Sequence, residues 1–272
     1  MKKTNKLKVL VACEESQVVT KEFRKLGHEA YSCDVVDSTG GHPEWHIKDD
    51  VLNHINKDWD MMIAHPPCTY LSISGSRWLY NKDGSRNEER WEKREQALDF
   101  VRDLLNAPIT HIALENPVSV ISSQIRKPDN VIEPYQFGHG ETKRTCLWLK
   151  NLPKLVPTNI VEGRETKIWN GMRDQTGKKL AWNSKEIKVA RSKTYKGIAE
   201  AIANQWSKYA LNYRASLLFF ILLSACAKDN DRCISYKVDQ YQKGETICNE
   251  GICEDTYITE IYCSYYENRK IN

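Results

Sequence analysis

Short apolar runs alternate with segments of helical spacing through the first two thirds of the chain. An apolar run bounded by polar residues predicts a buried strand, and apolar residues three or four positions apart predict an amphipathic helix. The predicted strands are 9–12, 30–33, 61–64, 109–114 and 145–149. The predicted helices are 16–26, 91–105 and 195–209, with a short one near 51–55. Gly27 stands where a helix C-cap belongs.

This alternation of strands and helices favours an α/β fold with a largely parallel sheet between two helical layers. In such sheets the functional residues lie just beyond the carboxyl ends of the strands. Polar groups occupy these positions here: Cys13 and Glu14, then Asp34, then the turn His65-Pro66-Pro67-Cys68, then Glu115-Asn116-Pro117. We therefore expect one site along this edge of the sheet.

Charge separates this part of the chain into two blocks. Residues 1–142 carry 18 Lys/Arg and 22 Asp/Glu, a net charge of −4, whereas residues 143–208 carry 15 Lys/Arg and 5 Asp/Glu, a net charge of +10. A basic block after a near-neutral one favours a polyanion partner, most often nucleic acid, and a solvated lysine-rich face is the alternative. Residues 151–190 lack periodicity and contain several Pro and Gly, so we expect an irregular basic insertion there.

Cysteine usage and hydropathy set the last part of the chain apart. Four of the nine cysteines lie in the first 210 residues, as in a reduced cytoplasmic protein, and five lie in the last 62, as in an exported, oxidised one. The apolar run 215–227 is shorter than the ~20 residues that a membrane-spanning helix needs. It has the length of a signal-peptide core, and Leu223-Ser224-Ala225-Cys226 resembles the lipobox of bacterial lipoproteins.

We therefore predict two parts: a catalytic domain, 1–209, and a tail, 210–272, with a lipoprotein-signal-like segment and a small cysteine-rich region in which four cysteines are available for two disulfides. A fusion of two reading frames is the favoured interpretation of the tail, with a membrane-associated segment or a buried helix as alternatives. We expect the first domain in the cytoplasm, no stable membrane span, and no catalytic role for the tail.

Three motifs in the first domain carry candidate chemistry. In Ala64-His65-Pro66-Pro67-Cys68, two fixed φ angles orient the thiol that follows them. In Leu114-Glu115-Asn116-Pro117, an acid ends an apolar strand, where partial burial would keep it protonated. The third motif runs from Phe137-Gly138 to Lys143-Arg144, and its last two residues are cations that stand directly before a predicted strand. Each motif alone has an ordinary structural explanation: a proline turn, a helix-initiating acid and a glycine hairpin.

Together and in this order, the motifs resemble those of the DNA cytosine-5 methyltransferases. That family has a Pro-Cys turn, a Glu-Asn-Val strand end and a Phe-Gly strand with arginines. More closely, residues 8–206 resemble a group of small phage and prophage proteins of this type. The resemblance implies a three-layer Rossmann-like methyltransferase fold that uses S-adenosyl-L-methionine, with DNA as the partner of the basic region 143–208. It makes 151–190 a minimal target-recognition region.

The resemblance also implies roles for individual residues. The Cys68 thiolate would add to C6 of a flipped-out cytosine, Glu115 would hydrogen-bond or protonate N3, and Arg144 would steady the base or a phosphate. Asp34 would accept from the ribose hydroxyls of the cofactor and Asp50 from its adenine amino group. The other residues implied in cofactor binding are Cys13, Glu14, Ser16, Val51 and Pro66.

Two other functions stay open. Where the family has a glycine-rich cofactor loop, this chain has Ala12-Cys13-Glu14-Glu15-Ser16-Gln17, which favours a catalytically weak nucleic-acid-binding relative. The second open function is a methyltransferase of the same fold that acts on another substrate, including the amino-directed type. In that type His65 would bind the exocyclic amine, and Cys68 would stand where the family has an aromatic ring that stacks on the base. No metal site is expected, because the candidate ligands Cys33, His42, His46, His65 and Cys68 lack ligand spacing.

Overall fold

The computed structural model of the chain describes residues 6–164, 172, 173, 175–181, 184, 186, 187, 192, 194–226, 242–249 and 252–258. The chain divides into two compact units, Met1–Tyr213 and Arg214–Asn272. The boundary lies four residues beyond the end of the predicted catalytic domain at residue 209. The first unit contains all of the residues singled out for chemistry.

A seven-stranded sheet of order β3-β2-β1-β4-β5-β7-β6 forms the centre of the first unit. Its strands are β1 (Lys8–Ala12), β2 (Glu29–Asp34), β3 (His46–Lys48), β4 (Met61–Ala64), β5 (His111–Pro117), β6 (Asn130–Ile132) and β7 (Thr145–Lys150). The pairs from β3 to β5 are parallel, and β7 runs antiparallel to both β5 and β6. The five predicted strands are all present. The sequence analysis missed β3 and β6, which are three-residue strands at the two edges.

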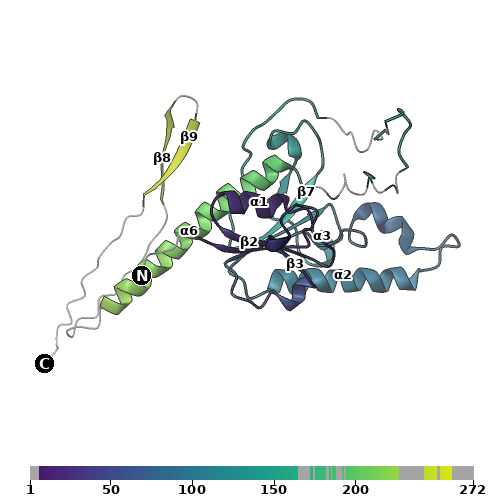
Figure 1. Ribbon diagram of the computed structural model, residues 1–272, viewed down its shortest axis with the longest axis horizontal. Coiled ribbons are helices and arrows are strands. Elements are labelled where there is room, and N and C mark those ends of the chain that lie inside the picture. The colour runs from purple at the N-terminus through teal and green to yellow at the C-terminus, as the bar shows by residue number, and fades with distance from the viewer. Residues whose placement is uncertain are drawn as a thin grey trace. The chain divides into compact units, whose positions relative to one another are not determined.

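Helices cover both faces of the sheet, which gives a three-layer Rossmann-like α/β fold, as predicted (Figure 1). Along β1, successive side chains alternate between the two cores, as the pleat of a strand requires. Helices α1 (Val18–Lys25) and α6 (Lys196–Cys226) cover one face, with the core residues Val9, Val11, Phe23, Met61, Ile63, Ile198, Ile202 and Trp206. Helix α2 (Glu88–Asn106) covers the other face, with Leu10, Ala12, Met62, Ala64, Leu98, Val101, Leu104 and Trp148.

Local sequence explains where α2 begins and ends. The Asn87 side chain accepts a hydrogen bond from the backbone N–H of Arg90, and Glu88 and Glu89 stand in the first turn, near the positive end of the helix dipole. The helix ends just before Pro108, because the residue that precedes a proline is disfavoured in helical conformation. The remaining helical elements are short: α3 (Ile121–Gln124) and the 3₁₀ turns η1 (Pro43–Trp45), η2 (Val51–Asn53), η3 (Ile73–Leu79) and η4 (Pro134–Gln136).

The described part of the predicted insertion is irregular. Residues 151–164 contain no helix or strand, and they are anchored by the buried side chain of Leu155 and by a backbone bridge between Asn159 and Phe137. Most of residues 165–190 lie outside the described residues, so the predicted target-recognition region stays a prediction.

Helix α6 is longer than predicted, because the apolar run that begins at residue 215 continues it to Cys226. Among the described residues, no helix is long and apolar enough to cross a membrane. In the second unit, β8 (Gln242–Asn249) and β9 (Ile252–Ile258) pair as an antiparallel hairpin. The side chains of the tail cysteines lie outside those described, so the two disulfides and the fusion stay predictions.

We predict that a chain truncated after Tyr213 folds on its own. Both hydrophobic cores lie within the first unit, and the last core residue is Ala210, against which Leu211 packs. Thermal unfolding followed by circular dichroism should be cooperative, with a Tm within about 4 °C of the full chain, since about 1 kcal/mol shifts Tm by that much at this size. Truncation after Tyr209 removes Ala210 and should lower the Tm further. Loss of the cooperative transition in the 213-residue chain would show that the tail completes the core.

Candidate active site

The register of the sheet brings four strand ends to the same level. Ala12 of β1 pairs with Cys33 of β2 and with Ala64 of β4, and Ala64 pairs with Leu114 of β5. Because these strands are parallel, the residues that follow stand side by side along the carboxyl edge: Cys13, Asp34, His65 and Glu115. Residues separated by more than a hundred positions in the sequence thus share one row.

The antiparallel strand β7 adds the basic pair to this edge. Thr145, at its amino end, pairs with Pro117, at the carboxyl end of β5. The residues just before Thr145, Lys143 and Arg144, therefore enter the sheet from the side on which Glu115 lies. A parallel strand at this place would have carried them to the opposite edge.

One buried side chain clamps the Pro-Pro-Cys turn to the next strand. The amide of Asn116, which is 1% exposed, donates a hydrogen bond of 2.9 Å to the carbonyl of Pro66. The backbone N–H of His65 donates to the carbonyl of Ala12 at 2.9 Å. The turn is thus attached to both neighbouring strands. Asn116, which the sequence analysis noted only as part of a motif, is thus a buried residue that attaches the turn to β5.

Beyond the clamp, the segment after Cys68 is joined to the segment after Glu115. The Cys68 carbonyl accepts from the backbone N–H groups of Leu71 and Ser72, at 3.1 and 2.9 Å. Leu71 in turn accepts from Val120 at 2.9 Å, and Ile73 donates to Val118 at 3.2 Å. The cysteine turn and the acid therefore move as one framework, which is what an enzyme needs to hold two reacting groups in register.

Cys68 is more exposed than the buried Cys33 and Cys146, and Cys13 is partly exposed as well. Cys68 is a partly exposed, reduced thiol. Burial, together with neighbouring acids, raises the pKa of both Cys13 and Cys33 to about 12, and burial also raises the pKa of Cys146. Since the thiolate is the nucleophile, those three are held in their unreactive form. Cys68 lies in the turn that Asn116 attaches to β5, the strand of Glu115, and it stays the candidate nucleophile.

Glu115 forms a pair with His65 that the sequence did not reveal. Nδ1 of His65 lies 3.0 Å from Oε2 of Glu115, and the two side chains are 11% and 23% exposed. Burial alone would raise the pKa of Glu115, but the hydrogen bond and charge of His65, and then the charge of Lys143, hold it below its usual value. The expectation that burial keeps this acid protonated is therefore wrong for the site as it stands. The proton of the pair resides on His65.

The pKa of His65 is shifted in the complementary direction. Burial would lower it, but the hydrogen bond and charge of Glu115 and the charge of Glu14 outweigh burial and Lys143 and raise it. A raised histidine pKa stabilises the fold below the ordinary value of 6.5, and a lowered glutamate pKa does so above 4.5. The His65–Glu115 pair thus makes its full contribution to the stability of the fold between pH 4.5 and pH 6.5. Its contribution declines as pH rises through the raised pKa of His65 or falls through the lowered pKa of Glu115.

Of the two cations before β7, Lys143 acts on the acid. Its charge lowers the pKa of both Glu115 and His65, its backbone N–H donates to Glu133 at 2.8 Å, and its ammonium lies 5.8 Å from the ring centre of Tyr195. Arg144, which the resemblance singled out, is 68% exposed and lies 3.8 Å from Glu133. Arg144 thus pairs with Glu133 at the surface, and its role toward a ligand stays a prediction.

The glycine-free loop after β1 adopts conformations that usually need glycine. Cys13 and Gln17 have φ angles of 58° and 55°, in the left-handed region that costs other residues about 1–2 kcal/mol each. The Gln17 side chain, fully buried, offsets this by bonding to both backbone groups of His42 and to Ser32. The loop therefore holds two left-handed residues without glycine, and the hydrogen bonds of the Gln17 side chain stabilise it.

Glu14, implied in cofactor binding, has a structural function in this loop. It is 4% exposed, and its carboxylate accepts from the backbone N–H groups of Val19 and Thr20 and from the Thr20 hydroxyl, at 2.6, 3.2 and 2.7 Å. An acid at this place satisfies the orphan donors at the start of α1. These bonds occupy its oxygens, so Glu14 shapes the loop rather than facing a ligand.

Two of the other implied cofactor residues form an acidic group near Cys13. The charges of Asp34 and Asp50 both raise the pKa of the Cys13 thiol, so these carboxylates lie close to it. Asp34 is partly buried, and Asp50 is exposed and accepts from the N–H of Leu52 at the start of η2. Glu15 adds a third acid, with a pKa raised by burial and by Asp34.

The remaining implied cofactor residues have less direct positions. Val51 is 3% exposed and packs in the core on the α2 face, and Pro66 is buried beneath the Asn116 clamp. Ser16 is partly buried, and its side chain hydrogen-bonds to Glu15. Among the described residues, no group of three or more His, Cys, Asp or Glu is arranged to hold a metal ion.

The segment that follows Cys68 is rich in stacked arginines and aromatic rings. Within residues 69–94, here called the arginine–aromatic segment, guanidinium groups lie over rings at 4.4–5.4 Å: Arg77 on Trp78, Arg86 and Arg94 on Trp91, and Arg90 on Tyr70. Trp78 and Tyr80 are each 54% exposed. Cations interleaved with exposed rings are typical of surfaces that bind single-stranded nucleic acid. The sequence analysis missed this segment, although its composition was visible.

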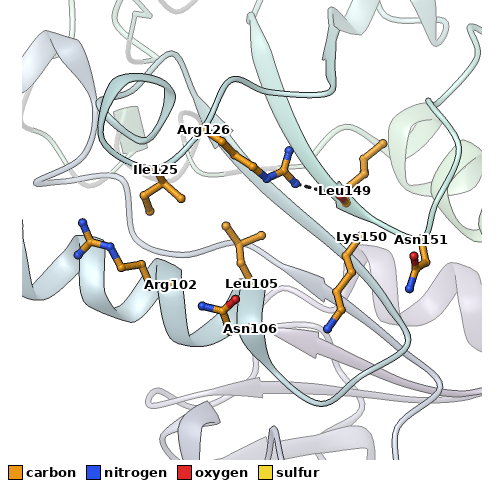
Figure 2. A pocket seen from close by; sticks show the side chains of 8 residues that line it. All are labelled: Arg102, Leu105, Asn106, Ile125, Arg126, Leu149, Lys150 and Asn151. Atoms are coloured by element: carbon orange, nitrogen blue, oxygen red, sulfur yellow. Dashed lines mark hydrogen bonds between the residues drawn. The ribbon is translucent and has the colours of Figure 1, made fainter.

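A pocket of about 540 Å³ lies at the opposite edge of the sheet (Figure 2). It is lined by the end of α2, the end of β7 and the loop after α3, with Arg126 bonded to the Leu149 carbonyl at 2.9 Å. Arg126 also pairs with Asp129, and Lys150 donates to the Ala107 carbonyl. These cations tie β7 to its surroundings, and the pocket contains none of the residues at the carboxyl edge.

No protein-family model matches the sequence, and no curated protein does. Among solved structures, the chain is similar to a protein described as a DNA modification methyltransferase encoded within a prophage of E. coli, at 12% identity over 62% of this chain and 56% of that one, TM-score 0.38. It is similar to DNMT2 of Spodoptera frugiperda, at 13% identity over 62% and 60%, TM-score 0.35. A third is the Dnmt2 methyltransferase of S. pombe, at 13% identity over 80% and 99%, TM-score 0.39.

The chain spans less than two thirds of the length of the first two of these structures. Likeness at this level does not assign an activity. The function is therefore argued from the residues of the site itself.

We predict that Asn116→Ala weakens the framework of the site. The substitution leaves the buried Pro66 carbonyl without its donor, which costs about 1–3 kcal/mol of unfolding free energy. Urea denaturation measures this loss. Asn204→Ala is the matched control, because its amide also donates to a backbone carbonyl, that of Glu200, but on the exposed side of α6. Equal effects of the two substitutions would refute the clamp.

Proposed function

We propose that the first unit transfers a methyl group from S-adenosyl-L-methionine to C5 of cytosine in DNA, through a covalent bond between Cys68 and C6 of the base. The observation that carries the proposal is the shared edge, where the cysteine turn, the acid and the cation stand beside an acidic loop. A binding surface alone would not require a nucleophile clamped to an acid on the adjacent strand.

The residues of the chain take distinct parts in this reaction. The Cys68 thiolate adds to C6 of a cytosine turned out of its stack, and Glu115 supplies a proton to N3, so that electron density gathers at C5. Lys143 stands close enough to act on the acid, and exposed Arg144 is available to a phosphate or to the base. After methylation, a water molecule takes the C5 proton, the C5–C6 double bond re-forms, and the cysteine leaves as a thiolate.

The donor set near Cys13 fits S-adenosyl-L-methionine. This molecule carries a sulfonium and an ammonium, and Glu15, Asp34 and Asp50 surround its expected place with negative charge. Asp34 would accept from the ribose hydroxyls and Asp50 from the adenine amine, while Cys13 and Ser16 would line the loop. When bound, the cofactor supplies an electrophilic methyl group.

Nucleic acid would be held on two sides of this site. The basic block 143–208 suits phosphate contacts, which position a strand without specifying its sequence. The arginine–aromatic segment begins directly after Cys68, and its exposed Trp78 and Tyr80 offer faces on which unstacked bases can lie.

One observation favours a second candidate, a nucleic-acid-binding relative with weak catalysis. The cofactor loop carries the side chain of Cys13 at a position where glycine would leave room, and Glu14 is committed to α1. Heat of binding measured with S-adenosyl-L-methionine separates the two, since a binding-only relative releases none.

We predict that the protein forms a denaturation-resistant adduct with DNA that contains 5-fluorocytosine when S-adenosyl-L-methionine is present. Fluorine at C5 blocks the final elimination, so the enzyme stays bound through Cys68. Cys68→Ser should abolish the adduct and reduce methylation by roughly 10³-fold or more. Gel electrophoresis under denaturing conditions provides the measurement.

Cys146→Ala is the matched control for this experiment, because Cys146 lies on the neighbouring strand β7 with a buried thiol. It should form the adduct like the unmodified protein. An adduct that persists in Cys68→Ser would exclude Cys68 as the nucleophile.

We predict that Trp78→Ala and Tyr80→Ala each weaken binding of a single-stranded oligonucleotide. Stacking of a base on an aromatic ring is worth about 1–3 kcal/mol, or roughly 5- to 150-fold in Kd. Fluorescence anisotropy of a labelled oligonucleotide at fixed salt measures this, with Tyr213→Ala, an exposed tyrosine on α6, as the control. Unchanged Kd values in both variants would remove the segment from the binding surface.

A further inference from the structure

The proposed reaction requires a proton that Glu115 itself does not hold. The acid must protonate or hydrogen-bond N3 of the base, yet His65 and Lys143 keep its pKa below the ordinary value. The titratable group hydrogen-bonded to Glu115 is the imidazole of His65, whose Nδ1 lies 3.0 Å from Oε2 of the acid.

We propose that His65 stores the proton that Glu115 lends to the base, so that the two side chains work as one acid. This inference rests on the proposed function. In it, His65 is a positioning residue: it acts through Glu115 and does not touch the base.

The position of His65 is fixed by its backbone contacts and not by the hydrogen bonds of its imidazole ring. Ala64 and Leu114 are register partners, so the next residues, His65 and Glu115, are neighbours across the β4–β5 pair. The backbone of His65 is held by Ala12, and Pro66 restrains the chain after it. Its side chain is therefore brought to the carboxylate whatever its state of charge.

The hydrogen bonds of His65 differ from those of a structural histidine in the same sheet. His46 uses both ring nitrogens to tie loops together, with Nδ1 2.8 Å from the Ser32 hydroxyl and Nε2 2.8 Å from the Val36 carbonyl. Nδ1 of His65 faces only Glu115, and its buried Nε2 has no hydrogen-bond partner among the described residues. A ring committed solely to a carboxylate is arranged for proton exchange with it.

The charges that face His65 come from three elements. Glu115 on β5 and Glu14 after β1 favour the imidazolium, and Lys143 before β7 opposes it. The two acids outweigh burial and the one cation, so the pKa of His65 lies above the ordinary histidine value. Both side chains of the pair are largely buried, which limits proton exchange with solvent. His65 thus holds its proton to higher pH than an ordinary histidine does.

The step balances without an external acid. As the sulfur of Cys68 forms its bond to C6, the C5–C6 π pair forms a C4–C5 double bond and the C4–N3 π pair moves to N3. Glu115 takes the proton of His65 Nδ1 and passes it to N3. The negative charge of the thiolate is cancelled by the proton gained at N3, and His65 becomes neutral. Elimination of the cysteine returns the N3 proton along the same route, and nothing is oxidised or reduced.

His65→Gln tests the inference, because glutamine can donate to Glu115 but cannot store a proton. We expect kcat at pH 8 to fall roughly 10²- to 10⁴-fold, the range for a general acid, with KM for DNA and for S-adenosyl-L-methionine unchanged. Activity should recover partly as pH falls, because Glu115 then takes protons from solvent. A pH profile of kcat with the shape of the unmodified enzyme would overturn the proposal.

His42→Gln is the matched control, since His42 forms a similar pair with Glu44 at 3.0 Å on an exposed surface. It should leave kcat and its pH profile unchanged. If the unmodified protein forms no adduct with 5-fluorocytosine DNA, the proposed function fails. If it forms the adduct and His65→Gln has no effect on the pH profile, only the role of His65 fails.

A titration by nuclear magnetic resonance gives a second readout that does not depend on turnover. The pKa of the His65 imidazole should lie above the ordinary histidine value of 6.5, and Glu115→Gln should lower it. A His65 pKa that is insensitive to Glu115→Gln would overturn the proposal, whatever the kinetic result.

Discussion

The pairing of β4 with β5 is the constraint on which the site depends. Its register sets His65 beside Glu115, and the Asn116 amide fixes the Pro66 carbonyl, and with it the turn that ends at Cys68. A slip by one residue would direct every side chain of β4 to the other core. The strand itself, Met61–Ala64, is fully buried, so this register is strongly specified by packing. The chemistry at the edge is therefore a consequence of how the sheet is packed.

The carboxyl edge of the sheet has two parts that differ in the charges around them. Around Cys13, acids accumulate, raising the pKa of the thiol and providing a place for a cationic ligand. Around Glu115, histidine and lysine compensate the acid and keep it ionised. The strained loop after β1 lies in the first part, and its left-handed residues persist because Glu14 and Gln17 are buried and fully bonded. Strain of this kind is typical of functional sites, where the surrounding structure over-determines the backbone.

Much of this arrangement was predictable from the sequence, and the reason lies in the burial of the central strands. Strands buried on both faces appear as continuous apolar runs, which identified β1, β4, β5 and the polar residues that follow them. The edge strands β3 and β6 are too short to show such a pattern. Helix α6 was predicted too short, because the apolar run after Tyr213 was interpreted as a separate segment.

The parts of the site that the sequence hid are those made by contacts between distant segments. The bond between His65 and Glu115 joins positions 50 residues apart, and no local spacing reveals it. Glu14 follows a strand end like Asp34, but it caps a helix, because its side chain meets the first turn of α1. Lys143 and Arg144 are adjacent in sequence, and only the structure shows that the charge of Lys143 acts on the acid.

The most direct test of the central claim is the chemical identity of the product. DNA and RNA substrates would be incubated with the full chain and S-adenosyl-L-methionine bearing a deuterated methyl group, digested to nucleosides, and separated by chromatography with mass detection. The account predicts labelled 5-methylcytosine from DNA. Labelled N4-methylcytosine or N6-methyladenine would contradict it, because a methyl group on an exocyclic amine needs neither the Cys68 nucleophile nor the proton of Glu115.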